Sequence, residues 1–176
     1  PGMHNVKNAL AAAAAAIALG VPGRAAEDGM RDFRLPGRRF EYKGMFNGAE
    51  VCDDYAHHPG ELAALLDTAQ ALDFKRVICA FQPHTYSRTH ELFDDFVRVL
   101  KRPAVTLLAE IFAAREDNDV GISSADLAAK IPGSVFCPTL EDVTAKLKRL
   151  AQPGDLILTV GAGDIYLAGE ALVKEE

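Results

Sequence analysis

Histidine, arginine and carboxylate side chains gather directly after apolar stretches of this sequence, and these residue types bind and activate small charged substrates. The segment Asp53-Asp54-Tyr55-Ala56-His57-His58-Pro59 follows one apolar stretch, and Gln82-Pro83-His84-Thr85-Tyr86-Ser87-Arg88-Thr89 follows another. Arginine grips a carboxylate through two parallel hydrogen bonds. With an arginine four residues after the histidine, we expect His84 and Arg88 to direct two cations into one opening. That arrangement suits a small carboxylate.

These residues also have structural interpretations. His57 and His58 can form a turn that caps the following helix, and Arg88 can pair with a neighbouring acid at the surface. A zinc site has little support, because no regular ligand spacing links the histidine pair to His84 or His90.

A glycine-rich turn, Gly161-Ala162-Gly163-Asp164, follows a further apolar stretch but does not match a dinucleotide-binding motif. Tyr166 occupies the third glycine position, and no strand with an acidic end follows. We interpret the segment as a tight turn with close backbone approach. The sequence also contains no phosphate-binding motif of the type G-x-x-x-x-G-K-[ST]. A hydrolase that uses Asp54 and His57 has little support, because no nucleophile elbow is visible.

The elements that must position these residues alternate between strands and helices. Asn47-Gly48 joins the extended runs 39–46 and 49–55, and this dipeptide is the strongest short hairpin signal because both turn positions need positive φ. Further strands are predicted at 76–81, 104–109, 134–137 and 155–160. Helices are predicted at 59–72, 89–100, 123–130 and 140–150, with a last helix after the glycine turn, and Ser123 and Asp126 suit a capping box. This alternation predicts an α/β fold with a mostly parallel sheet covered by helices on both faces.

Two helical segments, 5–19 and 24–33, precede the hairpin. Leu35-Pro36-Gly37 breaks helices, so we place a domain boundary there. The apolar part of the first segment, 10–19, has roughly half of the ~20 residues needed to cross a bilayer. We therefore expect a closely packed helix of a soluble protein, with Gly20 as its left-handed cap.

Composition and charge exclude several classes of protein. The 176 residues fit one ordinary domain with part of a second. A formal net charge of −6 and the lack of a lysine and arginine cluster argue against a nucleic-acid partner. Cys52, Cys79 and Cys137 are expected to be small buried hydrophobes in a reducing compartment, not a disulfide framework. We predict a cytoplasmic protein with no membrane partner.

Three motifs in this order resemble the Mur ligases of peptidoglycan synthesis. They are Gly2-x-His4-Asn5-x-x-Asn8-Ala9-Leu10-Ala11-Ala12, Arg38-Arg39-Phe40-Glu41 and the segment from Asp53 to Pro59. Within the family, Phe81-Gln82-Pro83-His84-x-Tyr86-x-Arg88-Thr89 is similar to the members that join L-alanine to UDP-N-acetylmuramate. The family's murein tripeptide recycling ligase shares the His-His-Pro turn and usually differs at this last motif.

The resemblance implies a place in a larger protein. Family members have a UDP-sugar domain, a central ATPase domain and a carboxy-terminal Rossmann-like domain. Residues 1–36 resemble the last helices of the central domain, and residues 37–176 resemble the carboxy-terminal domain. The UDP-sugar domain and the phosphate loop are not in this sequence, so the chain is expected to be inactive alone and to need those domains as partners.

The resemblance also implies the chemistry. ATP phosphorylates the substrate carboxylate, Mg²⁺ offsets the negative charge, and the amine of L-alanine attacks the acyl phosphate. Positions that contact the nucleotide in the family are, in this sequence, Asn5, Asn8, Arg39 and Asp54. Mg²⁺ is bound mainly by the central domain, and no metal ligand is assigned in this chain.

Positions around the incoming alanine are Tyr55, His57, His84 and Arg88. The resemblance implies that Arg88 holds the alanine carboxylate and that His57 and His84 have catalytic roles, positioning the amine or the transferred carbonyl. Gly60 stands where the family usually has threonine. Thr85 stands where many members have arginine, which removes one cation from the alanine site.

Two other interpretations stay open at this point. One is the corresponding domain of the murein tripeptide recycling ligase. The other is a free-standing module that binds a small anion or a protein partner at the strand ends.

Overall fold

The computed structural model describes residues 2–34 and 36–174, and the chain divides into two compact units, Pro1–Gly37 and Arg38–Glu176. The division falls at the helix-breaking segment where the domain boundary was predicted. That the first unit comes from a central ATPase domain stays a prediction.

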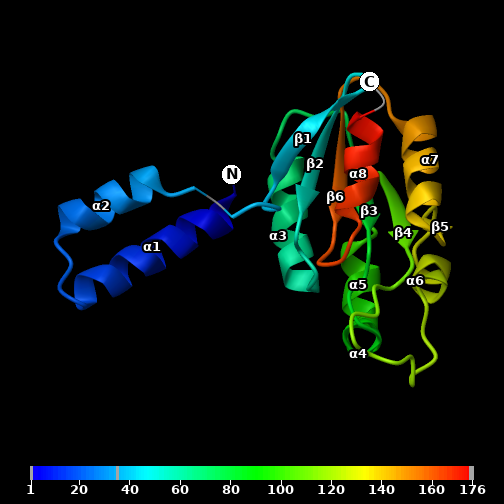
Figure 1. Ribbon diagram of the computed structural model, residues 1–176, viewed down its shortest axis with the longest axis horizontal. Coiled ribbons are helices and arrows are strands. Elements are labelled where there is room, and N and C mark those ends of the chain that lie inside the picture. The colour runs from blue at the N-terminus through cyan, green and yellow to red at the C-terminus, as the bar shows by residue number, and fades with distance from the viewer. Residues whose placement is uncertain (1, 35, 175–176) are drawn as a thin grey trace. The chain divides into compact units, whose positions relative to one another are not determined.

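The first unit is a pair of helices, α1 (Met3–Ala18) and α2 (Gly23–Asp32), which pack against each other (Figure 1). Gly20 follows α1 with a φ of 84°, as expected for a left-handed cap. The expectation of a closely packed apolar helix is not met within this chain, because Leu10 and Ile17 are exposed. Among the described residues, no helix has the length and apolar character needed to cross a membrane.

The second unit is built on a six-stranded sheet with the strand order β1-β2-β6-β3-β4-β5. The strands are β1 (Glu41–Phe46), β2 (Ala49–Asp54), β3 (Arg76–Phe81), β4 (Val105–Ala109), β5 (Val135–Cys137) and β6 (Asp155–Val160). β1 pairs antiparallel with β2, and all other pairs are parallel. The predicted α/β fold with a mostly parallel, Rossmann-like sheet is confirmed.

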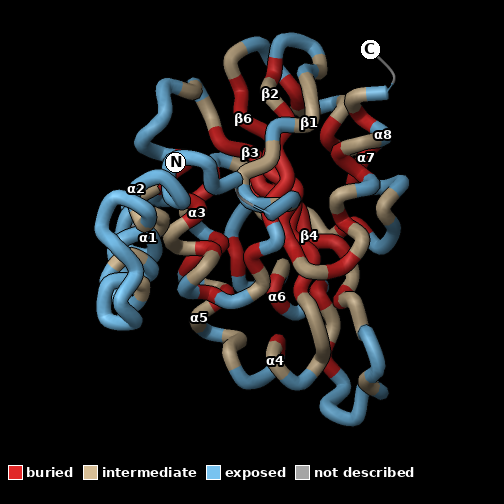
Figure 2. Tube along the Cα trace, turned by 60° about the vertical axis from the view of Figure 1, so that its left-hand side comes forward, coloured by how far each residue is buried: buried red, intermediate tan, exposed pale blue. Residues whose placement is uncertain are grey.

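Helices cover both faces of this sheet. They are α3 (Pro59–Gln70), α4 (Tyr86–Glu91), α5 (Phe93–Val99), α6 (Ser124–Lys130), α7 (Leu140–Leu150) and α8 (Tyr166–Val173). One core cluster joins alternate strand residues to α3, α5 and α6, and a second joins the other strand residues to α7 and α8. The buried segments coincide with the central strands (Figure 2). The sheet is therefore a fixed platform for the loops at its carboxyl ends.

Local signals in the sequence account for several of these elements. Asn47 and Gly48 both have positive φ, 48° and 73°, as the predicted hairpin turn requires. Ser123 and Asp126 form the predicted capping box at the start of α6. Each of the three cysteines is free and buried, and burial raises the pKa of the Cys52 and Cys79 thiols to about 12.

The single helix predicted over 89–100 is wrong. The segment forms α4 and α5, which are separated at Leu92, where φ is −105° and ψ is 22°. α4 also starts earlier than predicted, after Thr85 in a left-handed conformation with φ 69°. The break separates two tasks, because α4 carries Arg88 whereas α5 buries Phe96 in the core.

Candidate functional site

The loops that follow β2 and β3 bring the four predicted substrate residues together at the carboxyl edge of the sheet. The ring centroids of His57 and His84 are 6.2 Å apart, and Tyr55 contacts His57 edge-on at 5.6 Å. Arg88 Nη1 lies 3.4 Å from His84 Nδ1. The expected convergence of these side chains is therefore present, and their roles in binding stay predictions.

The two adjacent histidines in the turn after β2, His57 and His58, have different roles. His58 caps α3, because its Nδ1 accepts a hydrogen bond from the Gly60 N–H at 3.1 Å. The Glu61 carboxylate completes this capping box by accepting from the N–H groups of His57, at 2.9 Å, and His58, at 3.2 Å. Burial opposes ionisation of Glu61, but these hydrogen bonds outweigh it and its pKa is lowered. The cap is thus His58, whereas the His57 ring, whose Nδ1 lies 3.5 Å from the Glu61 carboxylate, faces Tyr55 and His84.

Hydrogen bonding distinguishes the two site imidazoles. His57 Nδ1 lies 3.0 Å from the Tyr55 carbonyl oxygen, which can only accept, so Nδ1 carries the proton and a neutral ring keeps a lone pair on Nε2. His84 Nδ1 faces the Arg88 guanidinium, which can only donate, so a neutral His84 ring carries its proton on Nε2. In the neutral rings, His57 Nε2 can therefore accept a hydrogen bond, whereas His84 Nε2 can donate one.

The surroundings of His84 favour its neutral form. Burial, followed by the positive charge of Arg88, lowers the pKa of His84 below its usual value of 6.5. The surroundings of His84 thus act against the expected pair of cations at His84 and Arg88, which stays a prediction. Two positive groups at this separation repel each other, which favours a neutral His84 imidazole beside the Arg88 cation.

Phe112, in the loop after β4, supports His84 and was not selected from the sequence. Its ring stacks on the His84 ring at 5.5 Å with an interplanar angle of 19°. Its carbonyl accepts from the Thr85 N–H and its own N–H donates to the Pro83 carbonyl, both at 2.9 Å. The only signal in the sequence is an aromatic residue just beyond a predicted strand.

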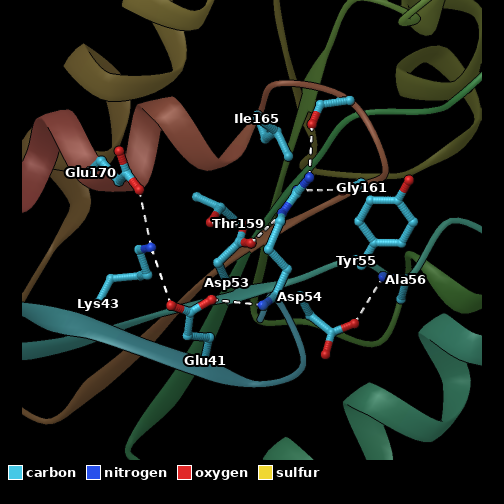
Figure 3. Close-up of polar contacts among 12 residues, drawn as sticks. Glu41, Lys43, Asp53, Asp54, Tyr55, Ala56, Thr159, Gly161, Ile165 and Glu170 are labelled. Carbon is cyan, nitrogen blue, oxygen red and sulfur yellow. Dashed lines mark hydrogen bonds and ion pairs between the residues drawn. The ribbon is translucent and has the colours of Figure 1, made fainter. Parts of the chain in front are cut away.

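Arg38 joins β2 to the glycine turn after β6. Its Nε donates to Asp53 at 2.7 Å, and its two terminal nitrogens donate to the carbonyls of Gly161, at 2.6 Å, and Gly163, at 3.0 Å. Asp53 is fully buried and also accepts from the Thr159 hydroxyl at 2.8 Å (Figure 3).

The same guanidinium also contacts two aromatic rings. Its central carbon lies 5.0 Å from the centroid of Tyr55 and 4.7 Å from that of Tyr166. Such cation–π contacts orient the ring as well as the cation. Arg38 therefore helps to place Tyr55, one of the predicted substrate residues, although only its neighbour Arg39 was given a role from the sequence.

The predicted nucleotide positions occur in both units. Asp54 accepts from the N–H group of Ala56 at 2.8 Å (Figure 3) and from that of Phe40, also at 2.8 Å, and burial raises its pKa. The Arg39 side chain is exposed, and its guanidinium lies 5.8 Å from the Tyr55 ring centroid. Asn5 and Asn8 lie one turn apart on α1 in the first unit. Their contacts with a nucleotide stay predictions.

The glycine turn makes the close backbone approach that was predicted. Gly161 has a φ of 149°, and a Cβ there would lie 2.6 Å from the Gln82 carbonyl oxygen. A Cβ at Gly163 would overlap the Gln82 side-chain oxygen and approach Phe112 Cγ to 2.7 Å. Gln82 is itself fixed, because its amide donates to Asp164 at 2.8 Å and accepts from the Ile165 N–H at 3.2 Å.

Comparison with known proteins places this domain. The family model described as Mur ligase, glutamate ligase domain, matches residues 38–163. The chain belongs to the Mur ligase family. This Mur ligase chain is 48% identical over 99% of its length to a UDP-N-acetylmuramate–L-alanine ligase of Lachnospira eligens, and 45% identical over 99% to that of Clostridium novyi. It spans 39% of the length of each of these relatives.

Solved structures agree with this assignment. A UDP-N-acetylmuramate–alanine ligase of Thermotoga maritima matches 99% of this Mur ligase chain with a TM-score of 0.76 and 26% identity, over 38% of its own chain. A murein peptide ligase of Psychrobacter arcticus matches 98% with a TM-score of 0.71 and 27% identity, over 37% of its own chain.

Proposed function

We propose that this chain is the amino-acid-binding, carboxy-terminal part of an ATP-dependent ligase that joins L-alanine to UDP-N-acetylmuramate in peptidoglycan synthesis. The observation that carries this proposal is the convergence of His57, His84 and Arg88 at the carboxyl edge of a parallel sheet. The relatives named as UDP-N-acetylmuramate–L-alanine ligases support the choice of substrates.

Arg88 would hold the carboxylate of L-alanine. Its guanidinium is half-buried beside the neutral His84, so it offers a positive charge that no carboxylate of the described chain pairs with in a salt bridge. A bidentate grip on the substrate would fix the amino acid in one orientation. Positioning of this kind is a large part of the rate enhancement when two substrates must meet.

The two imidazoles would then act at opposite ends of the new amide bond. The lone pair on His57 Nε2 can accept a proton from the alanine ammonium group, which makes the amine nucleophilic. The proton on His84 Nε2 can be donated as a hydrogen bond to the carbonyl oxygen that gains negative charge during attack. The lowered pKa of His84 favours the neutral form of the ring that this assignment uses.

ATP as co-substrate would supply the phosphoryl group that activates the UDP-N-acetylmuramate carboxylate. The exposed Arg39, whose neighbour Phe40 donates its N–H to Asp54, fits a phosphate, and the Asp54 carboxylate is held in place by two backbone N–H groups. Asn5 and Asn8 would add contacts from α1. Following the family, we assign Mg²⁺ mainly to the central domain; the described residues contain no group of three or more histidine, cysteine or acidic residues placed to hold a metal ion.

The chain would depend on the rest of the ligase for turnover, since separate domains must close to assemble the site and exclude water. This is tested by comparing phosphate release from ATP by the isolated chain and by the full-length ligase, each with UDP-N-acetylmuramate and L-alanine. We expect turnover by the full-length protein only. Robust turnover by the isolated chain would refute the proposal that it is an inactive part of the ligase. A full-length protein that does not use L-alanine would refute L-alanine as the substrate.

A murein tripeptide recycling ligase is the second candidate, favoured by the similarity to the murein peptide ligase structure. The same assay separates the two functions if murein tripeptide replaces L-alanine as the amine substrate. Use of the tripeptide in preference to L-alanine would favour the recycling function. A free-standing binding module would instead show micromolar binding of L-alanine or another small acid to the isolated chain in calorimetry.

A further inference from the structure

A cavity of about 290 Å³ is lined by Phe112, the residue whose ring stacks on His84 of the candidate site. Its lining comes from the loops after β3, β4, β5 and β6 and includes Gln82, Glu110, Phe112, Thr139 and Asp164. None of the four predicted substrate residues lines it. Phe112 links the two spaces, because it lines the cavity and stacks on His84.

The Phe112 ring is held in this position by its neighbours. One contact is the stacked His84 ring, with centroids 5.5 Å apart. Another is Gly163, where a Cβ would come within 2.7 Å of Phe112 Cγ, so the ring occupies the space that a side chain would need. The backbone of Phe112 is tied to Pro83 and Thr85 on either side of His84. The ring is thus held against His84, and the same residue lines the cavity.

The charge of the cavity restricts what could enter it. Glu110 and Asp164 are acidic, and none of the described residues that line the cavity is basic. The Gln82 amide donates to Asp164, which keeps that carboxylate in place. Such a space favours a neutral or basic side chain, because a carboxylate would be repelled by Glu110 and Asp164.

We propose that Phe112 is a specificity-determining residue, whose ring closes the amino-acid site toward this cavity and thereby limits the incoming amino acid to a small side chain. The inference rests on the proposed function of the site. Removal of the ring joins the two spaces. An amino acid whose carboxylate and amine are bound at the same positions then has room for a longer side chain.

The test uses the full-length ligase with Phe112→Ala and compares kcat/KM for L-alanine, L-glutamine and L-glutamate. Glutamine and glutamate have nearly the same shape and differ in charge. We expect the glutamine-to-alanine ratio to rise at least about tenfold, since one methylene in a pocket changes selectivity roughly 10- to 200-fold. Glutamate should gain much less than glutamine. An unchanged glutamine-to-alanine ratio would overturn the proposal.

Two matched variants control for general loosening of the site. Phe112→Tyr keeps the ring and should keep the wild-type ratio. Leu140→Ala enlarges the cavity from the α7 side without removing the Phe112 ring, and it should also keep the ratio. A raised ratio in Leu140→Ala equal to that of Phe112→Ala would contradict the role of the ring.

Thermal unfolding checks that each variant folds. If Phe112→Ala does not fold, Phe112→Leu, which shortens the side chain and stays apolar, should show a smaller rise of the same ratio, and no rise there would count against the proposal. Failure of the wild-type ligase to use L-alanine would refute the proposed function. Use of L-alanine by the wild type with an unchanged ratio in both variants would refute only the role of Phe112.

Discussion

The guanidinium of Arg38 donates to the fully buried carboxylate of Asp53 at 2.7 Å. This pair connects the first residue of the second unit to the end of β2, and the remaining nitrogens of Arg38 extend the connection to the turn after β6. Arg38 thus ties the end of β2 to the turn after β6, and it also contacts Tyr55 in the loop after β2.

Replacement of Arg38 by alanine should destabilise the chain, because it leaves the buried Asp53 carboxylate without its cation. Loss of one partner of a buried ion pair should lower the free energy of unfolding by about 3 kcal/mol. This is the lower end of the usual range, and it applies because the Arg38 side chain is 21% exposed. Urea unfolding measures the change. Arg39→Ala is the matched control, since its side chain is exposed, and it should change stability by less than about 0.5 kcal/mol. Equal losses in the two variants would contradict the anchoring role.

Replacement of Gly163 by alanine should also be destabilising, since the added Cβ meets the Gln82 side chain and the Phe112 ring. Overpacking of this kind costs roughly 1–3 kcal/mol. Gly29→Ala in α2 is the control, because a Cβ there meets nothing within 4 Å and alanine is the better helix former. Thermal unfolding should therefore show a loss only for Gly163→Ala, and a neutral result there would mean that the turn has room to adjust.

The lowered pKa of His84 predicts a pH-dependent contribution to stability. The folded state binds a proton at His84 less readily than the unfolded state, whose pKa is near 6.5. The contribution is therefore fully present above pH 6.5 and is lost as the pH falls through the folded pKa. Free energies of unfolding measured from pH 7.5 down to pH 5 should decline more steeply for the wild type than for His84→Asn, in which this group is absent. Parallel curves would show that His84 titrates alike in both states.

Most of the fold could be predicted because its signals are local. Asn47-Gly48 favours the positive φ angles of a tight hairpin turn, and the strand over 155–160 contains the apolar run Leu156-Ile157-Leu158. The break at Leu92 was missed because the apolar pattern continues through it. Helical hydrogen bonding also continues, from the Leu92 N–H to the Arg88 carbonyl at 3.0 Å.

The residues of the site could be predicted, but the charge state of His84 and the residues that hold the site in place could not. Motif resemblance identified the residues that meet, whereas the protonation of His84 depends on burial and on Arg88 in three dimensions. Nothing local distinguishes Arg38 from Arg39, since the partners of Arg38 at Gly161 and Gly163 lie far away in the sequence. Phe112 was missed for the same reason, because its stacking on His84 joins two separate loops.

The central claim, that Arg88 binds the carboxylate of L-alanine, is tested most directly by steady-state kinetics of the full-length ligase with Arg88→Ala. Loss of a charged hydrogen-bond partner corresponds to roughly a 10- to 100-fold rise in KM for L-alanine. Arg115→Ala, at an exposed arginine of the loop after β4, is the control and should leave this KM unchanged. KM for L-alanine should rise far more than KM for ATP in Arg88→Ala. A KM for L-alanine equal to that of the wild type would contradict the claim.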